Sequence, residues 1–202
     1  MKEKRIDLYD EQIKDSFISY NMNINNIEVR KEKDKKHILL KKEDHQIVMA
    51  LDNENRMISY YNDLIFHIED NFLRNNKYLK SIYMDNVVLI ENSFMEKNID
   101  LKYIYAPYLE EVGNDFLSHN DNLKCLELPS LKRFGFFFLQ RNKHLKELKV
   151  SHLKEMGKCY LIQNKVLDML EIPEDISNQF IYNSSFKNNF RHSEKKLVLT
   201  KS

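Results

Sequence analysis

This sequence contains little glycine, proline or cysteine, and it has no long apolar run. Its 202 residues include three glycines, three prolines and two cysteines. A disulfide framework and a glycine-rich nucleotide loop are therefore both excluded. The sequence has no stretch of about 18 apolar residues, the length that would be needed to cross a membrane. Its first ten residues lack the apolar core of a signal peptide. We therefore expect a soluble, cytoplasmic protein that has reduced thiols and no membrane contact.

Neither sign of charge is in excess. The 32 Lys and Arg residues against 31 Asp and Glu residues leave a formal charge of +1, so no global field selects nucleic acid or an acidic membrane. The apolar fraction of 42% argues against intrinsic disorder. The length predicts one domain, or one domain with an appendage.

The few glycines and a set of asparagines reveal an internal repeat. The three glycines are spaced by 22 residues, and two of the three prolines share that spacing. Five asparagines lie on the same lattice and mark the repeat starts: Asn76, Asn98, Asn120, Asn142 and Asn164. A fixed period of this length is typical of a solenoid, in which each repeat forms one turn and stacks on its neighbours.

Seven positions of the repeat, counted from the asparagine as position 1, are almost always apolar. Positions 4, 7, 9, 12, 15, 19 and 20 are apolar in 34 of 35 slots over the five repeats that begin at residue 54, with Asn62 as the exception. Composition alone would fill about 15. The aromatic residues at position 19 predict a stacked spine, made of Phe72, Phe94, Phe116, Phe138 and Tyr160. We interpret the asparagines as a ladder that satisfies backbone groups of the turns.

The order of elements within one repeat predicts the fold class. Alternation at positions 7 and 9, as in Leu126-Glu127-Leu128, indicates a strand with one buried face. The glycine at position 16, followed by residues such as 114–118, predicts a tight turn into about one turn of helix. We therefore expect an α/β solenoid with a parallel β-sheet on one face and short helices or turns on the other.

The repeat resembles a known family. Leu123-Lys124-Cys125-Leu126-Glu127-Leu128 and Leu145-Lys146-Glu147-Leu148-Lys149-Val150 match the L-x-x-L-x-L pattern of leucine-rich repeats. The segment from Leu123 through Gly135 to Asn142 resembles the BspA-like subfamily, although this repeat is one residue shorter, Phe-Leu replaces Ala-Phe, and Asn replaces Cys. The resemblance covers roughly residues 54–173. It implies a leucine-rich repeat solenoid that serves as an interaction scaffold and has no catalytic motif.

The flanking segments predict caps for the ends of the solenoid, which would otherwise expose their cores. We assign residues 1–53 to an N-terminal cap of one helix and a β-hairpin, 54–175 to the leucine-rich repeat solenoid, and 176–202 to a C-terminal cap. In the first cap, residues 36–40 and 46–51 read as strands, and a helix is predicted from Leu8, Ile13, Phe17 and Ile18. In the second, residues 197–199 read as a last strand, and the core is closed by Phe180, Ile181, Phe186 and Phe190.

The outward strand positions 5, 6 and 8 form what we call the strand face, the open sheet surface on which ligands of solenoids usually bind. Position 8 carries Tyr61, Tyr83, Tyr105, Glu127 and Lys149 in successive turns. Position 5 carries four lysines in line, the lysine column: Lys80, Lys102, Lys124 and Lys146. Position 6 adds Tyr103.

We predict that these ten residues bind another protein with an acidic or mixed surface. Exposed tyrosines supply contact area at little entropic cost, and aligned lysines repel one another until anionic groups neutralise them. A simpler interpretation is that tyrosine suits a half-exposed strand and that the lysines splay apart and keep the surface solvated. Such a module could act as an adaptor or an inhibitor, and we expect a monomer.

Two alternatives belong to other classes of function. The lysine column with Lys149 could bind nucleic acid or another polyanion, with the tyrosines stacking on bases. An enzyme is not expected, because the chain lacks the His-Glu-x-x-His, Cys-x-x-Cys and Gly-x-Ser-x-Gly motifs. The seven histidines occupy different repeat positions and do not stack into a metal site, so we expect no metal and no cofactor.

Overall fold

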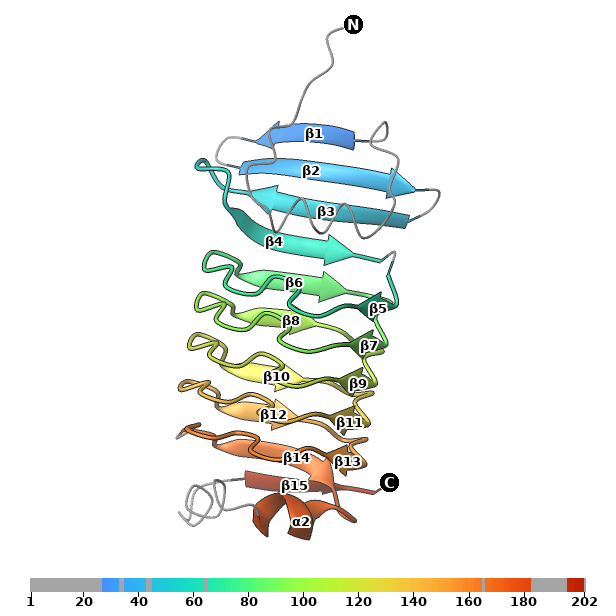
Figure 1. Cartoon of the computed structure of the whole chain (residues 1–202), viewed down its shortest axis with the longest axis vertical. Coiled ribbons are helices and arrows are strands. Elements are labelled where there is room, and N and C mark those ends of the chain that lie inside the picture. Colours follow the sequence, from blue (N-terminus) through green and yellow to red (C-terminus); the bar gives the residue numbers. More distant parts are fainter. Residues whose placement is uncertain are drawn as a thin grey trace, which may run out of the picture.

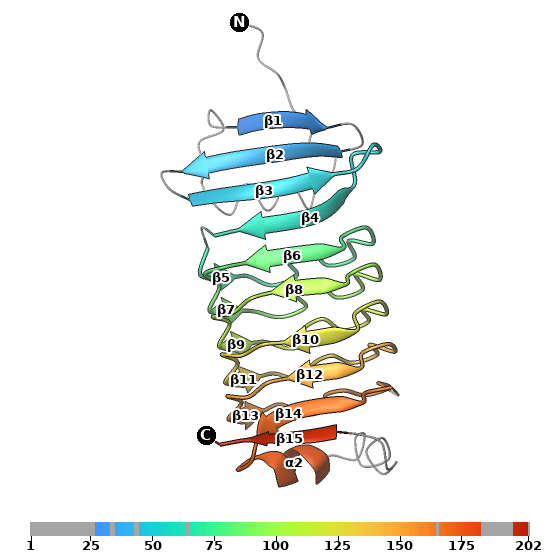
Figure 2. The ribbon, with the colours of Figure 1, turned by 180° about the vertical axis from the view of Figure 1, so that it is seen from behind.

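The computed structural model describes residues 27–32, 35–42, 45–63, 65–164, 166–182 and 196–201. Over this part of the chain, successive 22-residue segments form an elongated β-solenoid of about five turns (Figures 1 and 2). Each turn contributes a strand to one sheet and a two-residue strand to a second sheet. The predicted repeat and solenoid are therefore confirmed.

The first sheet starts with antiparallel strands and continues as a parallel ladder. Its order is β1 (Ile27–Glu32), β2 (Lys35–Lys42), β3 (His45–Leu51), β4 (Met57–Asn62), β6 (Ser81–Met84) and β8 (Tyr103–Tyr105). The surface extends through a second hydrogen-bonded group of parallel strands, β10 (Cys125–Glu127), β12 (Glu147–Lys149), β14 (Met169–Pro173) and β15 (Lys196–Thr200) (Figure 1). The strands expected at 36–40, 46–51 and 197–199 correspond to β2, β3 and β15. β1 was not predicted, because its residues show no clear pattern.

A second parallel sheet, which the sequence did not indicate, runs along another side of the solenoid. It consists of β5 (His67–Ile68), β7 (Leu89–Ile90), β9 (Glu111–Val112), β11 (Arg133–Phe134) and β13 (Glu155–Met156). Strands of two residues are too short to show an alternation of apolar and polar residues. They exist because the same positions of neighbouring turns hydrogen-bond to one another.

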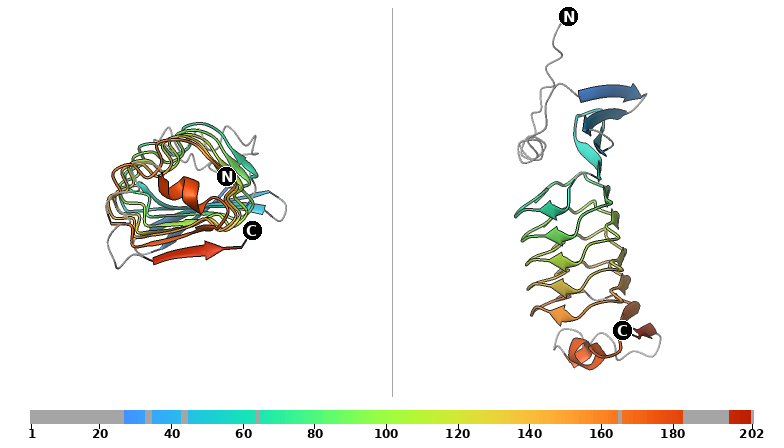
Figure 3. Two further views of the ribbon diagram at one scale, coloured as in Figure 1. Left: turned by 90° about the horizontal axis from the view of Figure 1, so that it is seen from below. Right: turned by 90° about the vertical axis from the view of Figure 1, so that its right-hand side faces the viewer.

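The apolar slots of the repeat fill the space between these sheets. The side chains of Phe72, Phe94, Phe116 and Phe138 stack with ring centroids 5.4 to 6.0 Å apart. Phe134 joins this column, and its ring lies 5.3 Å from that of Tyr160. The Tyr160 hydroxyl donates to the backbone carbonyl of Phe180 at 2.8 Å. Phe180 belongs to helix α2 (Ser177–Tyr182), which lies inside the outline of the stacked turns when the solenoid is viewed end-on (Figure 3).

The asparagine column forms the expected ladder. The side-chain amides of Asn98, Asn120, Asn142 and Asn164 are fully buried, and each donates to a carbonyl of the preceding turn at 2.7 to 3.0 Å. The acceptors are the carbonyls of Leu73, Met95, Leu117 and Leu139. A buried carbonyl without a partner costs about 1 to 3 kcal/mol, which explains why the asparagine recurs in successive turns from Asn98 to Asn164.

The parallel sheet of the expected solenoid is confirmed, but the α/β description is wrong: on the other face, which we call the return side, the chain forms turns in place of short helices. In each turn the residues at positions 18, 20 and 22 have positive φ, for example Asp115 (54°), Leu117 (53°) and His119 (63°). This alternation is incompatible with a helix. The amide of Leu117 donates to Phe94 in the turn before, whereas those of Asp115 and His119 donate to the turn after, at 2.8 to 3.1 Å. Hydrogen bonds between turns thus replace those within a helix and offset the cost of left-handed backbone at leucine. α2 is the one helix in the described part of the chain.

Several sequence predictions concern residues beyond those described. The amphipathic helix predicted from Leu8 to Ile18, and the closing residues Phe186 and Phe190, lie outside the described ranges. The limits 1–53, 54–175 and 176–202 stay predictions.

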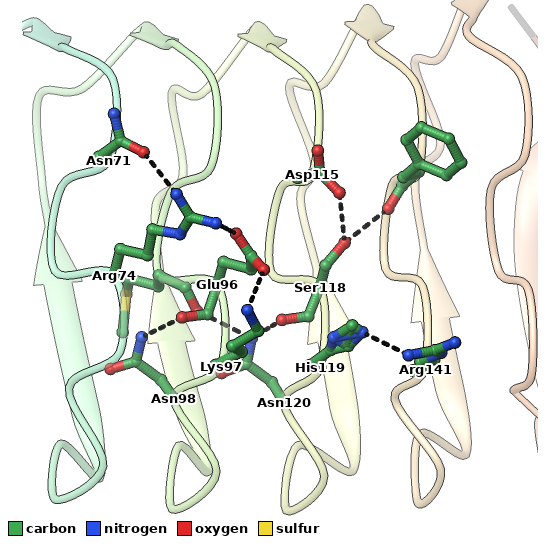
Figure 4. A network of polar contacts seen from close by, with 12 residues as sticks. Asn71, Arg74, Glu96, Lys97, Asn98, Asp115, Ser118, His119, Asn120 and Arg141 are labelled. Carbon is green, nitrogen blue, oxygen red and sulfur yellow. Dashed lines mark hydrogen bonds and ion pairs between the residues drawn. The ribbon is translucent and has the colours of Figure 1, made fainter.

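A polar network crosses the return side of the solenoid (Figure 4). Glu96 is 7% exposed and forms ion pairs with Arg74 at 2.7 Å and Lys97 at 3.1 Å. In the next turn, Asp115 accepts a long hydrogen bond of 3.4 Å from the Ser118 hydroxyl. Burial and the neighbouring charge of Glu96 raise the pKa of Asp115. The folded state therefore disfavours the ionised form of Asp115.

Replacing Asp115 by asparagine should stabilise the protein at neutral pH, by about 0.5 to 1 kcal/mol. Asparagine removes the partly buried charge and tolerates the same positive φ. Because the folded pKa is raised, the penalty of the aspartate develops as the pH rises through that pKa and is absent at lower pH. Urea unfolding between pH 7 and pH 3 should show a gain that disappears toward acid. Asp121→Asn, which removes the 3.0 Å ion pair with Lys143, should give no gain, and a pH-independent gain from Asp115→Asn would contradict the explanation.

Candidate interaction surface

Stacking of the turns aligns the side chains of the strand face as the sequence register requires. Tyr61 pairs with Tyr83 and Tyr83 with Tyr105 across the parallel strands β4, β6 and β8. Glu127 pairs with Lys149 across β10 and β12. Residues 22 apart in the chain are therefore direct neighbours on the surface.

Three tyrosines form one aromatic patch. The ring of Tyr103 lies 5.3 Å from that of Tyr83 on the neighbouring strand. Tyr103 and Tyr105 are 48% and 43% exposed, and Tyr83 is half-buried. We call Tyr83, Tyr103 and Tyr105 the tyrosine patch. Rigid, half-exposed aromatic side chains of this kind are enriched in the energetically dominant parts of protein interfaces.

Tyr61 differs from the other tyrosines of its column. Its hydroxyl is 3.0 Å from a carboxylate oxygen of Asp85 and 3.1 Å from one of Asp63. Burial, together with these two carboxylates, raises the pKa of Tyr61. Because the hydroxyl of Tyr61 is already hydrogen-bonded within the protein, we do not include Tyr61 in the tyrosine patch.

Each lysine of the lysine column lies one residue before a strand, in front of β6, β8, β10 and β12. All four side chains are exposed: Lys80, Lys102, Lys124 and Lys146. Backbone hydrogen bonds join two pairs of them, because the Lys102 amide donates to the Lys80 carbonyl at 2.9 Å and the Lys146 amide donates to the Lys124 carbonyl at 2.7 Å. Within the described ranges, no carboxylate lies within 4.0 Å of these four ammonium groups. Their positive charges are therefore left for solvent or a partner.

Opposite charges intermingle on the C-terminal part of the strand face. The Lys149 ammonium is 3.3 Å from a carboxylate oxygen of Glu127, and this contact raises the pKa of Lys149.

Cys125, on the same part of the strand face, is exposed and forms no disulfide, but partial burial and the charge of Glu147 raise the pKa of its thiol. A raised pKa disfavours the thiolate, so Cys125 lacks the feature that makes cysteines reactive.

Near the tyrosine patch in the chain, the structure shows a further exposed aromatic residue, Tyr108, that the repeat columns did not indicate. Tyr108 is 61% exposed and follows Tyr105 by three residues, just after Pro107 ends the run of β8. The equivalent positions hold Asn86, Ser130 and His152, so no column of like residues pointed to it. Its one sequence signal is an aromatic side chain in a turn.

A groove of about 580 Å³ lies on the second sheet, over β7, β9, β11 and β13. Its floor includes Gly113, Gly135 and Gly157, and its charged lining includes Glu111, Arg133 and Glu155. The Arg133 guanidinium forms an ion pair with Glu111 and lies 4.0 Å from Glu155. The charges that line the groove therefore already compensate one another.

Comparison with known proteins does not place the chain. No protein-family model, curated protein or solved structure matches it. The described residues contain no group of three or more His, Cys, Asp or Glu side chains arranged to hold a metal ion. They also contain no helix with the length and apolar character needed to span a membrane.

Proposed function

We propose that this chain is a non-enzymatic interaction module that binds another protein through its strand face. The observation that carries the proposal is the tyrosine patch beside a column of four lysines that have no carboxylate partner among the described residues. The aromatic patch supplies the contact area, and the lysines favour a partner with an acidic or mixed surface. A module of this kind works as an adaptor or as an inhibitor that covers a site on another protein.

The leucine-rich repeat assignment, with its BspA-like variant, belongs to the same proposal. It is supported by burial of the residues that match the pattern, such as Leu123, Leu126 and Leu128. A return segment of turns in place of helices is the feature in which this solenoid departs from the expected fold.

The tyrosine patch provides the direct test. A variant with Tyr83, Tyr103 and Tyr105 all changed to serine should bind the native partner at least 100-fold more weakly, because each central aromatic anchor contributes about 2 kcal/mol or more. The partner is first captured from the native cell on the immobilised wild-type protein, and its affinity for each variant is then measured by calorimetry.

The matched control carries Phe66→Ser and Phe136→Ser, which remove two exposed aromatic side chains outside the strand face. Both variants should keep the circular dichroism spectrum of the wild type, and the control should keep its affinity. Equal binding by the serine variant and the wild type would refute the strand face as the binding surface.

The lysine column favours a second candidate, the binding of nucleic acid or another polyanion. Salt separates the two functions. Binding to phosphates should weaken steeply and linearly on a plot of log affinity against log salt concentration, with about one unit of slope for each lysine that contacts a phosphate. A protein contact centred on tyrosines should change far less with salt.

A further inference from the structure

The two functional columns of the strand face run parallel to the solenoid axis and are a fixed distance apart. The lysine column occupies position 5 and the tyrosine column position 8 of each turn. Three residues separate these positions along the chain, so the two columns lie at most about 10 Å apart. An α-helix is about 10 to 12 Å wide with its side chains, so a helix lying along the axis would have one flank over the lysines and the other over the tyrosines.

The spacing of the lysines also favours a helix over an extended segment. Turns of the solenoid are about 4.8 Å apart, so the lysine column from Lys80 to Lys146 spans about 14 Å. Acidic residues at i, i+4, i+7 and i+11 of a helix span about 16 Å along one stripe. Four alternate residues of an extended strand span about 20 Å. A helix differs from the lysine column by about 2 Å and an extended strand by about 6 Å, so a helix requires much less splaying of the lysine side chains.

Charge gives the docked helix a direction. The aromatic part of the strand face lies on β6 and β8, whereas its carboxylates, Glu127 and Glu147, lie on β10 and β12. The Lys149 ammonium partly neutralises Glu127. A complementary helix would therefore carry apolar residues at the end over Tyr83 and Tyr103, and a basic residue at the end over Glu147.

We infer that the partner presents an amphipathic α-helix with an acidic stripe, and that this helix binds along the solenoid axis with its carboxylates on the lysine column and its apolar flank on the tyrosine patch. This inference rests on the proposed function, because it names the partner element that the same surface recognises. The recognition resembles that of a helix laid in a groove, with anchors at helical spacing.

Selection from a display library of random 16-residue peptides tests the inference, with the full-length protein as the immobilised target. Peptides are counter-selected on a variant in which Lys80, Lys102, Lys124 and Lys146 are changed to glutamine. The enriched peptides should carry Asp or Glu every three to four residues, should become helical on binding, and should bind the glutamine variant at least tenfold more weakly. Acidic residues at every second position, peptides that stay non-helical when bound, or no dependence on the lysines would overturn the inference.

Charge alone is controlled by a second quadruple variant, with Lys77, Lys143, Lys154 and Lys158 changed to glutamine. These lysines are exposed and lie outside positions 5, 6 and 8, so enriched peptides should keep their affinity for this variant. A labelled 16-nucleotide single strand is measured in parallel at physiological salt. If it binds the wild type more tightly than the enriched peptides and loses affinity for the first glutamine variant, the inference fails in favour of nucleic acid.

The serine variant of the tyrosine patch distinguishes failure of the helix inference from failure of the proposed function. If that variant loses the native partner while the selected peptides show no helical period, the proposed function stands and the helix inference falls. If that variant keeps the native partner, the proposed function falls as well.

Discussion

Replacing Phe116 by alanine is expected to lower the free energy of unfolding by about 3 to 5 kcal/mol. Its side chain is fully buried and stacks between those of Phe94 and Phe138, at centroid distances of 5.4 and 5.7 Å. Alanine would leave a cavity in the middle of the spine, and the neighbouring turns cannot close on it because their hydrogen bonds fix their separation. This loss is a large part of the total stability of a typical domain.

The matched control for this variant is Phe136→Ala. Phe136 belongs to the next turn and is 47% exposed, so its removal should cost less than about 1 kcal/mol. Both variants are measured by urea unfolding followed by circular dichroism. Similar midpoints for the two would show that the aromatic column is not the centre of the core.

Replacing Gly135 by alanine should cost about 2 to 3 kcal/mol, although the change adds a single methyl group. A Cβ atom at this position would lie 2.7 Å from the carbonyl carbon of Gly113 and 2.8 Å from the amide nitrogen of Asn114. Both are backbone atoms of the preceding turn and cannot rotate away. The turns would have to separate, which would also strain the 2.7 Å hydrogen bond from the Phe136 amide to the Asn114 side chain.

The same repeat position contains its own control. Position 16 holds Glu91 in an earlier turn and glycine in the turns of β9, β11 and β13. Glu91→Ala keeps a Cβ atom where one already fits and removes an exposed contact with His67 at 2.9 Å. The free energy of unfolding should therefore change by less than about 1 kcal/mol. Equal stability of Gly135→Ala and the wild type, in thermal and urea unfolding, would refute close approach of the turns as the reason for glycine.

Much of the architecture was predictable because a solenoid presents the same environment once per turn. Leu123, Leu145 and Leu167 all occupy position 4 of the repeat and are fully buried. Each repeat therefore gives the same evidence that position 4 faces the core. The strand alternation, the aromatic spine and the asparagine ladder followed from the same reasoning. β1 and the second sheet did not, because their residues carry no comparable alternation.

The return segment shows where local pattern misled. Asn114 to Ser118 resembles the start of a helix, and a helix would satisfy its own backbone groups. The neighbouring turns offer the amides and carbonyls of this segment other partners, so residues of positive φ alternate with residues of negative φ. No single repeat contains the information that decides between these outcomes.

The candidate surface divides in the same way. Register alone put Tyr83 beside Tyr105 and aligned the lysines, but it could not show that Tyr61 is bound to Asp85, which lies 24 residues away, or that Tyr108 stands exposed in a turn.

By itself, therefore, the sequence determined the period, the buried positions and the composition of each surface column, since these depend on spacing along the chain. Only the tertiary structure decided the path of the return segment and the set of tyrosine hydroxyls left for a partner. Both depend on hydrogen bonds that form only when separate turns come together.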